Sequence, residues 1–120
     1  MLIRFKNNFF VILFFIIVST LNIFSQNIYI HDPVLIKQDS LYYLFSTGWG
    51  ISKFYSRDLI NWNKDSPVFE ESPLWTKEVI KGFKGHIWAP DILFYNGNYY
   101  LFYSVSTFGK NNSCIGVAIN

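Results

Sequence analysis

Two segments of this chain repeat each other, and the repeat limits the folds that the chain can adopt. Residues 42–45 and residues 99–102 both read Tyr-Tyr-Leu-Phe, at an offset of 57 positions. The same offset places Pro33 on Pro90. A fixed repeat of this length indicates stacked units that are each too small to bury their own apolar face. When the unit consists of short strands, the architecture that it favours is a β-propeller.

Local patterns predict an all-β chain with almost no helix. Val, Ile, Tyr and Phe are concentrated in short runs between turn signals, of which Asn96-Gly97 is the strongest because both residues accept positive φ. At the repeat offset this turn falls on Asp39-Ser40, and residues 48–50 are also predicted to form a turn. We expect a connection at residues 70–84, with one helical turn near residues 75–79. The predicted strands are residues 34–37, 41–46, 51–56, a short piece around Trp62, and residues 91–95, 98–104 and 114–119.

Aromatic residues make up 21% of the chain and supply most of its expected core. Sheets that pack face to face need large apolar side chains between them. Trp49, Trp88 and Phe108 fall at strand ends and turns, where core packing explains them less well. Cys114 is the only cysteine, so an intramolecular disulfide is excluded, and its apolar neighbours predict a buried strand thiol. The aromatic residues predicted to lie in the core are Tyr43, Phe45, Phe94, Tyr100 and Phe102.

The first residues have the pattern of a secretory signal peptide. Arg4 and Lys6 precede an unbroken apolar run at residues 9–18, and small or polar residues follow that run. The run is shorter than the ~20 apolar residues that a membrane span needs. We therefore predict a signal peptide at residues 1–26 and a secreted or periplasmic protein. An uncleaved membrane anchor is the competing interpretation.

The charge of the predicted mature part, residues 27–120, is balanced. The formal net charge of +2 arises from Arg4 and Lys6, so the remaining acidic and basic residues cancel. Nothing in this balance favours nucleic acid or an anionic membrane surface as a partner. A neutral partner such as an uncharged sugar fits better.

The two units differ at the corner that precedes their first strand. The first unit reads His-Asp-Pro at residues 31–33 and the second reads Trp-Ala-Pro at residues 88–90, which aligns Asp32 with Ala89. Pro33 has a fixed φ and restricts the residue before it to extended geometry, which would orient Asp32. An oriented carboxylate at the mouth of a propeller channel can act as a general base. The alternative is an Asp that only caps a turn before a strand.

Four motifs occur in order, with compatible spacing, between residues 28 and 120. They are His-Asp-Pro at residues 31–33, Ser-Arg-Asp-Leu-Ile-Asn-Trp at 56–62, His-Ile-Trp-Ala-Pro-Asp-Ile at 86–92 and Tyr-Ser-Val-Ser-Thr-Phe-Gly at 103–109. Together they closely resemble glycoside hydrolase family 43, and within it the endo-acting α-1,5-L-arabinanases. The resemblance implies a five-bladed β-propeller. Residues 27–120 would then be the N-terminal part of a longer protein, comprising the first blade and most of the second.

The resemblance implies an inverting glycoside hydrolase that cleaves α-1,5-L-arabinan, a side chain of pectin and hemicellulose. It makes Asp32 the general base that deprotonates the attacking water. In inverting enzymes the base and the general acid are about 6.5–9.5 Å apart, which leaves room for that water. The family's second Asp and its Glu general acid belong to later blades, so we expect neither in this chain and expect the fragment alone to be inactive. The interblade residues Glu70, Glu71 and Glu78 are expected to be solvated surface.

The resemblance also implies a sugar-binding cleft. It makes Trp88 a platform for a sugar ring and places Phe108, with Gly109 beside it, along the cleft. A flat aromatic ring suits the apolar face of a furanose without requiring charge. His31 either lines the sugar pocket or packs in a turn. Asp91 either contacts sugar or makes a hydrogen bond at the start of a strand.

Other functions fit the same motifs. They are another family 43 activity, such as β-xylosidase or α-L-arabinofuranosidase, a non-catalytic sugar-binding propeller, and the product of a disrupted gene. The expected partner is a neutral polysaccharide or oligosaccharide, with no nucleic acid, no membrane after signal cleavage, and a monomeric parent protein. We expect no metal and no cofactor within this fragment, and a structural calcium in the parent has no support in this sequence.

Overall fold

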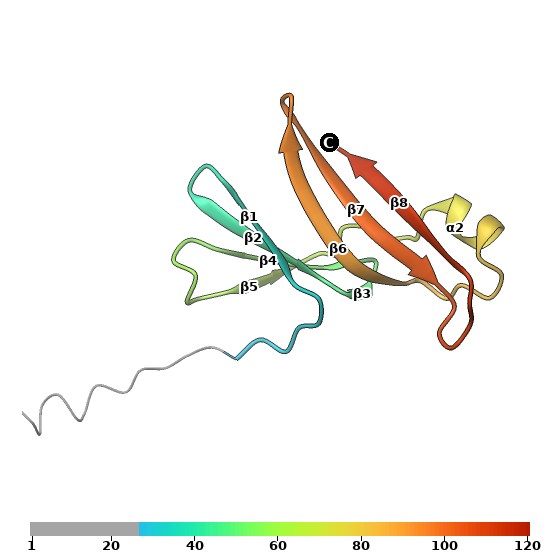
Figure 1. The fold of residues 1–120 in the computed structure, drawn as a ribbon. Helices are drawn as coiled ribbons and strands as arrows, with labels where there is room; N and C mark the ends of the chain where they lie inside the picture. Colours follow the sequence, from blue (N-terminus) through green and yellow to red (C-terminus); the bar gives the residue numbers. More distant parts are fainter. Residues whose placement is uncertain (1–26) are drawn as a thin grey trace, which may run out of the picture.

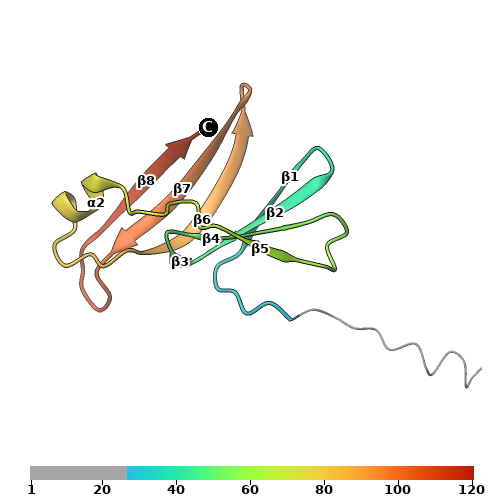
Figure 2. The same ribbon diagram turned by 180° about the vertical axis from the view of Figure 1, so that it is seen from behind.

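The computed structural model describes residues 27–120, which form two four-stranded antiparallel sheets (Figure 1). The predicted signal peptide lies outside the described residues. The first sheet has the order β1-β2-β4-β5 and the second has the order β3-β6-β7-β8. Seen from behind, the two sheets lie side by side and diverge toward their hairpin ends (Figure 2). The strands are β1 (Val34–Gln38), β2 (Leu41–Ser46), β3 (Gly48–Trp49), β4 (Ser52–Ser56), β5 (Asn63–Asp65), β6 (His86–Tyr95), β7 (Asn98–Ser106) and β8 (Ser113–Ile119).

The sequence repeat corresponds to two equivalent β-hairpins. The β1–β2 turn and the β6–β7 turn each contain two residues, and they lie 57 positions apart. Asp39 and Asn96 begin these turns with positive φ values of 53° and 48°. Gly97 follows with φ of 83°, which completes the pair of left-handed residues that a type I′ turn requires. Both predicted hairpins are confirmed.

The predicted turn at residues 48–50 is wrong in part. Gly48 and Trp49 form β3, which leaves the first unit and pairs with β6 of the second sheet. Ile51 has a φ of 63°, which is not a strand conformation, so β4 begins at Ser52 and not at the predicted Ile51. The side chain of Ile51 is fully buried. The chain therefore crosses to the second sheet for two residues and then returns, which ties the two units together.

The connection between the units contains the predicted helical turn. Helix α2 (Leu74–Val79) follows Pro73, whose carbonyl accepts a hydrogen bond from the Thr76 hydroxyl at 2.6 Å. Ile80 and Phe83 come directly after the helix and are buried in the core. Within the described part of the chain, no helix is long and apolar enough to span a bilayer.

The hydrophobic core lies between the two sheets and draws on both units. Phe45 and Ile51 come from the first unit, and most of the other members come from the second. Cys114 is half-buried and packs against this core, so the predicted thiol position is confirmed but its complete burial is not. The buried residues of this core are Phe45, Ile51, Ile80, Phe83, Ile87, Leu101, Tyr103 and Val105. Leu44 is also buried, at 9% exposed, but is not part of this core.

Two aromatic residues that were predicted to lie in the core are exposed. The side chain of Phe94 is 53% exposed, because it lies near the β6–β7 turn, where the sheets diverge, and it contacts the Tyr99 ring at 4.7 Å. Phe102 is 40% exposed, because it pairs with Val117 on the face of the second sheet that is turned away from the first. Tyr43 packs against the core as expected. The apolar pattern therefore predicts that these residues lie in strands, but it does not show which face of the sheet is covered by the other sheet.

Candidate active site

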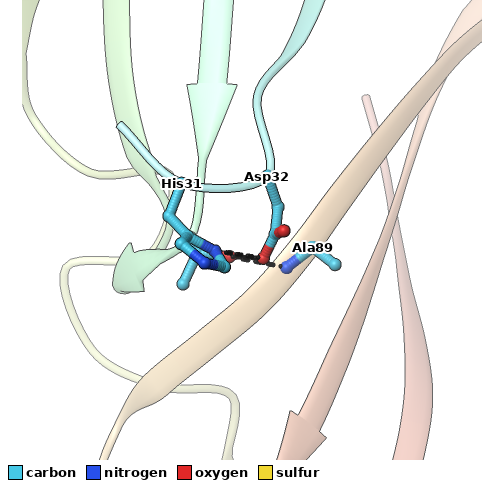
Figure 3. A network of polar contacts seen from close by, with 4 residues as sticks. His31, Asp32 and Ala89 are labelled. Atoms are coloured by element: carbon cyan, nitrogen blue, oxygen red, sulfur yellow. Dashed lines mark hydrogen bonds and ion pairs between the residues drawn. The ribbon is translucent and has the colours of Figure 1, made fainter. Parts of the chain in front are cut away.

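A network of polar contacts joins the corners of the two units (Figure 3). The Thr47 hydroxyl donates to Oδ2 of Asp32 at 2.8 Å and accepts from the Ala89 backbone N–H at 2.8 Å. The Thr47 backbone N–H donates to the His31 carbonyl at 3.0 Å. Because Ala89 follows Trp88 directly, Asp32 and Trp88 lie at the same end of the two sheets, as the repeat predicts.

The corner residues of the two units share an unusual backbone conformation. Asp32 has a φ of 50° and Ala89, which is 57 positions later, has a φ of 44°. The predicted extended geometry of Asp32 before Pro33 is therefore wrong. A left-handed conformation costs a residue other than glycine about 1–2 kcal/mol, less for Asp than for most. Such a conformation persists where the surroundings determine it, and the hydrogen bonds of Thr47 fix both corners.

A β-bulge frees the Ala89 N–H for this network. Trp88 pairs with Ser104 and Asp91 with Phe102, so the β6 strand has one residue more than β7 across this step. The bulge falls on Ala89 and Pro90, and Pro is confined to edges and bulges because it has no N–H for the ladder. The extra residue leaves the Ala89 N–H outside the ladder, where it points to Thr47.

The Asp32 carboxylate is held in its ionised form. The hydrogen bond from Thr47, and then that from Nδ1 of His31 at 2.8 Å, hold the pKa of Asp32 below its ordinary value, against a smaller effect of desolvation. Both donors contact Oδ2, and Oδ1 accepts no hydrogen bond from the described residues. The side chain of Asp32 is 39% exposed. Its free oxygen is therefore available to a water molecule.

Thr47 is a site residue that sequence reasoning missed. Its importance depends on partners 15 and 42 residues away, which no local pattern around residue 47 reveals. One signal was available in the repeat, because the offset of 57 places Thr47 on Ser104, another hydroxyl residue. Ser104 pairs directly with Trp88 in the second sheet.

Four aromatic rings form a row beside the carboxylate. The His86 ring lies between two tryptophans, 5.7 Å from Trp49 and 4.4 Å from Trp88 between centroids. The Phe108 ring stacks on Trp88 at 6.1 Å, with an angle of 22° between the ring planes. The side chain of Phe108 is 85% exposed and that of Trp49 is 64% exposed. The row therefore presents flat apolar surface to solvent.

Two adjoining grooves follow this row and share His86 and Trp88. One has a volume of about 320 Å³ and is lined by Trp49, Thr107 and Phe108 among others. The second has a volume of about 390 Å³, and its lining includes His31 and Thr47, the two residues that hydrogen-bond to Asp32. Nδ1 of His86 and Nε1 of Trp88 are buried and have no hydrogen-bond partner among the described residues. The two grooves are therefore lined by ring faces, and these two ring nitrogens are not accessible from either groove.

Two predicted site residues, Asp91 and Gly109, line neither groove. Asp91 is exposed and belongs to neither lining, and its Oδ1 accepts a hydrogen bond from the Ile92 N–H at 2.9 Å. This contact corresponds to the predicted alternative to a sugar contact, a hydrogen bond at the start of a strand. Gly109 follows Phe108 with a φ of 73°, so it turns the chain directly after the stacked ring.

Asp32 itself belongs to neither groove lining, and it adjoins the second groove through its hydrogen bonds to His31 and Thr47. The groove linings contain Lys64 and Lys84 but neither Asp nor Glu. The three glutamates of the interblade stretch, residues 70, 71 and 78, are exposed and line neither groove, as predicted. The described site thus offers one ionised carboxylate and an aromatic surface.

Comparison with known proteins identifies the family. Residues 24–120 match the family described as Glycosyl hydrolases family 43. The chain belongs to glycosyl hydrolase family 43. The predicted family and its class of enzyme, the glycosidases, are thereby confirmed.

The relatives of this family 43 chain are arabinan-degrading enzymes. It is 47% identical over 96 residues to the extracellular exo-α-(1→5)-L-arabinofuranosidase of Cellvibrio japonicus, covering 80% of this chain and 28% of that protein. It is 39% identical over 98 residues to the extracellular endo-α-(1→5)-L-arabinanase 1 of Bacillus subtilis, covering 78% and 30%. Its fold matches Cellvibrio cellulosa α-L-arabinanase complexed with arabinohexaose, with a TM-score of 0.75, 47% identity and coverage of 79% and 30%.

The chain spans about 30% of the length of these relatives. The likeness to solved arabinanases, together with the two blade-like sheets, confirms the predicted fold class. Activity and substrate concern the whole protein that contains these blades.

Proposed function

We propose that this chain supplies the general base and part of the sugar cleft of an inverting glycoside hydrolase that cleaves α-1,5-L-arabinan. The observation that supports this most strongly is the Asp32 carboxylate, held on one oxygen by Thr47 and His31 beside a row of aromatic rings. Asp32 takes a proton from water through its free oxygen, and that water attacks the anomeric carbon.

The aromatic row supports an uncharged sugar as the substrate. The exposed ring of Phe108 and its stacked neighbour Trp88 give flat surfaces that suit the apolar faces of furanose rings. We assign Trp88, Phe108, Gly109 and His31 to this cleft. For Asp91 the contact with the Ile92 N–H favours a structural role.

We propose that the general acid lies outside the described residues. Asp32 is the only Asp or Glu of the described residues that hydrogen-bonds to a residue of either groove lining, although an inverting enzyme needs a second carboxyl about 6.5–9.5 Å from its base. General acid catalysis typically contributes about 10²–10⁴-fold to the rate. We therefore expect the purified chain alone to release no arabinose oligomers above a blank.

Secretion fits the same function. We propose that residues 1–26 are a cleaved signal peptide, because a positive start precedes an apolar run of suitable length. The relatives from Cellvibrio japonicus and Bacillus subtilis are both named as extracellular. Polymeric arabinan is an extracellular substrate, so its hydrolase has to leave the cytoplasm.

The test uses the protein that carries this chain, assayed on linear α-1,5-arabinan. Asp32→Asn should lower kcat by about 10²–10⁴-fold and leave oligosaccharide binding in place, because the base acts in the transition state. The matched control is Asp65→Asn, which removes an Asp that pairs with Lys53 at 3.2 Å outside the grooves. An Asp32→Asn protein with the kcat of the parent would refute the base assignment.

The proposed hydrolase could cleave arabinan at chain ends (exo action) or within the chain (endo action), and the names of the relatives support both candidates. The relative with 47% identity is named an exo-acting arabinofuranosidase, whereas that with 39% identity is named an endo-acting arabinanase. Exo action predicts that product of a single short length accumulates from the first minutes of digestion. Endo action predicts a broad mixture of oligomers and a rapid fall in viscosity. Chromatography of early digestion products separates the two.

A further inference from the structure

The ring of Phe108 belongs to a tight turn in the loop that joins β7 to β8, at residues 107–112. The Lys110 N–H donates to the Thr107 carbonyl at 3.0 Å, which places Phe108 and Gly109 in the middle of the turn. The φ of 73° at Gly109 fits the third position of a type II turn, which requires a positive value. The backbone of this turn therefore determines where the Phe108 ring lies.

The side chain of Thr107 joins this turn to the chain that connects the two units. Its hydroxyl donates to the Lys81 carbonyl at 2.8 Å, across 26 positions of sequence. The side chain of Asn112 supports Thr107 from the other end of the loop. Its Nδ2 donates to the Thr107 hydroxyl and its Oδ1 accepts from the Thr107 N–H, both at 3.4 Å. The turn is thus held at Thr107 to a residue outside its own sheet.

The Lys81 carbonyl is a fixed anchor because residues on both sides of it are buried. Ile80 is 2% exposed and Phe83 is 8% exposed, and the Phe83 N–H donates to the Ile80 carbonyl at 3.1 Å. Gly82 has a φ of 84°, and a Cβ added there would lie 3.5 Å from Cγ2 of Thr107. The backbone at residues 81 and 82 therefore packs directly against the Thr107 side chain. We call residues 81–85, which precede β6, the anchor segment.

The anchor segment also contacts the ring at the other end of the aromatic row. Gly85 has a φ of 104°, and a Cβ added there would lie 3.1 Å from Cε3 of Trp49. The Gly85 carbonyl accepts a hydrogen bond from the Gly50 N–H, next to Trp49, at 3.2 Å. Trp49 and Phe108 are the two outer rings of the row. One segment of backbone therefore contacts the elements that carry both outer rings.

We infer that the anchor segment positions the two outer rings of the sugar cleft, and that Thr107 is the residue through which it positions Phe108. This inference rests on the proposed function, because the rings are assigned to the binding of the same sugar chain. Thr107 is a positioning residue that acts through the Phe108 ring. A ring that is fixed before binding loses less conformational freedom when the sugar binds. Loss of the Thr107 bond should therefore weaken binding without slowing the chemical step.

Kinetics on linear α-1,5-arabino-oligosaccharides test the inference in the protein that carries this chain. Thr107→Val keeps the shape of the side chain but removes its donor, and we expect KM to rise by about 3–10-fold with kcat unchanged. Thr107→Ser, which keeps the hydroxyl, should restore the KM of the parent. The matched control is Asn111→Ala, at an exposed position of the same loop that lines neither groove, and its KM should equal that of the parent.

A double-variant cycle with Phe108→Ala separates positioning of the ring from other effects. In the Phe108→Ala background, Thr107→Val should raise KM no further, because no ring is left to position. The same rise in KM in both backgrounds would show that Thr107 acts on the sugar directly or through the fold as a whole, and would overturn the inference. A Thr107→Val protein with the KM of the parent would overturn it too.

Hydrogen exchange of the Lys110 amide gives a readout that does not depend on the sugar. This amide donates to the Thr107 carbonyl, so Thr107→Val should speed its exchange and Thr107→Ser should not. Equal exchange in the parent and in Thr107→Val would overturn the inference. Failure of the proposed function is a distinct result: the parent protein would cleave no arabinan, while the faster exchange in Thr107→Val would still support the hold of Thr107 on the turn.

Discussion

The corners of the two units have nearly the same backbone but different chemistry. Asp32 and Ala89 lie 57 positions apart, share a left-handed φ near 50° and 44°, precede a proline, and contact the same Thr47 hydroxyl. In the first unit the contact is a carboxylate oxygen that accepts a hydrogen bond. In the second it is a backbone N–H that donates one. The hydroxyl of Thr47 can satisfy both because it is a donor and an acceptor.

The comparison shows how a repeated scaffold acquires a site in one copy. The fold requires the corner, the proline and the hairpin that follows, and both units have them. At the corner position itself the first unit has the carboxylate of Asp32 and the second has Ala89, with Trp88 next to it. In the function proposed above, the chemistry resides in side chains added to a common backbone, as function generally resides in sites placed on folds.

Exchanging the two corner residues should have the largest effect. The double variant Asp32→Ala, Ala89→Asp keeps composition and charge but moves the carboxylate to the second corner. We expect kcat on linear arabinan to stay about 10²–10⁴-fold below the parent, no better than Asp32→Ala alone, because a base must be positioned toward its water. Recovery of activity in the double variant would show that the two corners are chemically equivalent.

Removing the shared hydroxyl should have an intermediate effect. Thr47→Val has nearly the same shape but breaks the bonds to both Asp32 and Ala89. We expect kcat/KM to fall by up to about 10²-fold, as displacement of a catalytic group by about 1 Å can cause. Thr47→Ser, which keeps the hydroxyl, is the control. Equal kinetics for the two variants would show that the bridge does not position the carboxylate.

The same variant should change the pH dependence in a defined direction. The Thr47 hydrogen bond is the largest cause of the lowered pKa of Asp32, so its loss should raise that pKa toward its ordinary value. The acidic limb of the kcat/KM profile should then move to higher pH. The pH dependence of stability should change as well. A carboxyl whose pKa is lower in the folded than in the unfolded protein stabilises the fold at pH values above its unfolded pKa, near 3.9. That stabilisation is lost as the pH falls through the folded pKa. Acid titration of unfolding should therefore be less steep in Thr47→Val.

The two hairpin turns should differ in a smaller way. Gly97 has a φ of 83°, and no atom lies within 4 Å of the position where a Cβ would be added. Gly97→Ala should therefore cost only the backbone strain, about 1–2 kcal/mol of unfolding free energy. Ser40 is the equivalent residue of the first unit and has no positive φ, so Ser40→Ala should stay within about 0.5 kcal/mol. Urea unfolding of the two variants measures the difference.

Elements with local signals could be predicted from the sequence. The turns at Asp39-Ser40 and Asn96-Gly97 and the helical turn of α2 follow from residue types within a few positions. Asp32 and Trp88 were found through the repeat and the family motifs, and the structure places them at one end of the sheets. The turns, the helical turn and the placement of the two corners could be predicted because short-range backbone preferences and the repeat lead to the same arrangement, whereas the roles of Asp32 and Trp88 stay predictions.

The features that sequence reasoning missed depend on distant partners. Strand β3 exists because Gly48 and Trp49 meet β6, nearly forty residues later, although two glycines nearby predict a turn. The role of Thr47 depends on Asp32 and Ala89, which are far from it in sequence and contact its hydroxyl only in the folded chain. Phe102 has the pattern of a core residue, but whether it is buried depends on what covers its sheet.

The measurement that tests the base assignment most directly is chemical rescue of an Asp32→Gly protein by azide. Glycine suits the left-handed φ of this corner and leaves space for a small anion. Azide needs no base: its terminal nitrogen bonds to the anomeric carbon as the glycosidic C–O bond breaks, and the leaving oxygen takes its proton from the general acid. We predict that azide restores turnover and that the product is β-L-arabinofuranosyl azide, with inverted configuration. Turnover that azide does not restore, or a glycosyl azide of retained α configuration, would contradict the assignment of Asp32 as the base of an inverting enzyme.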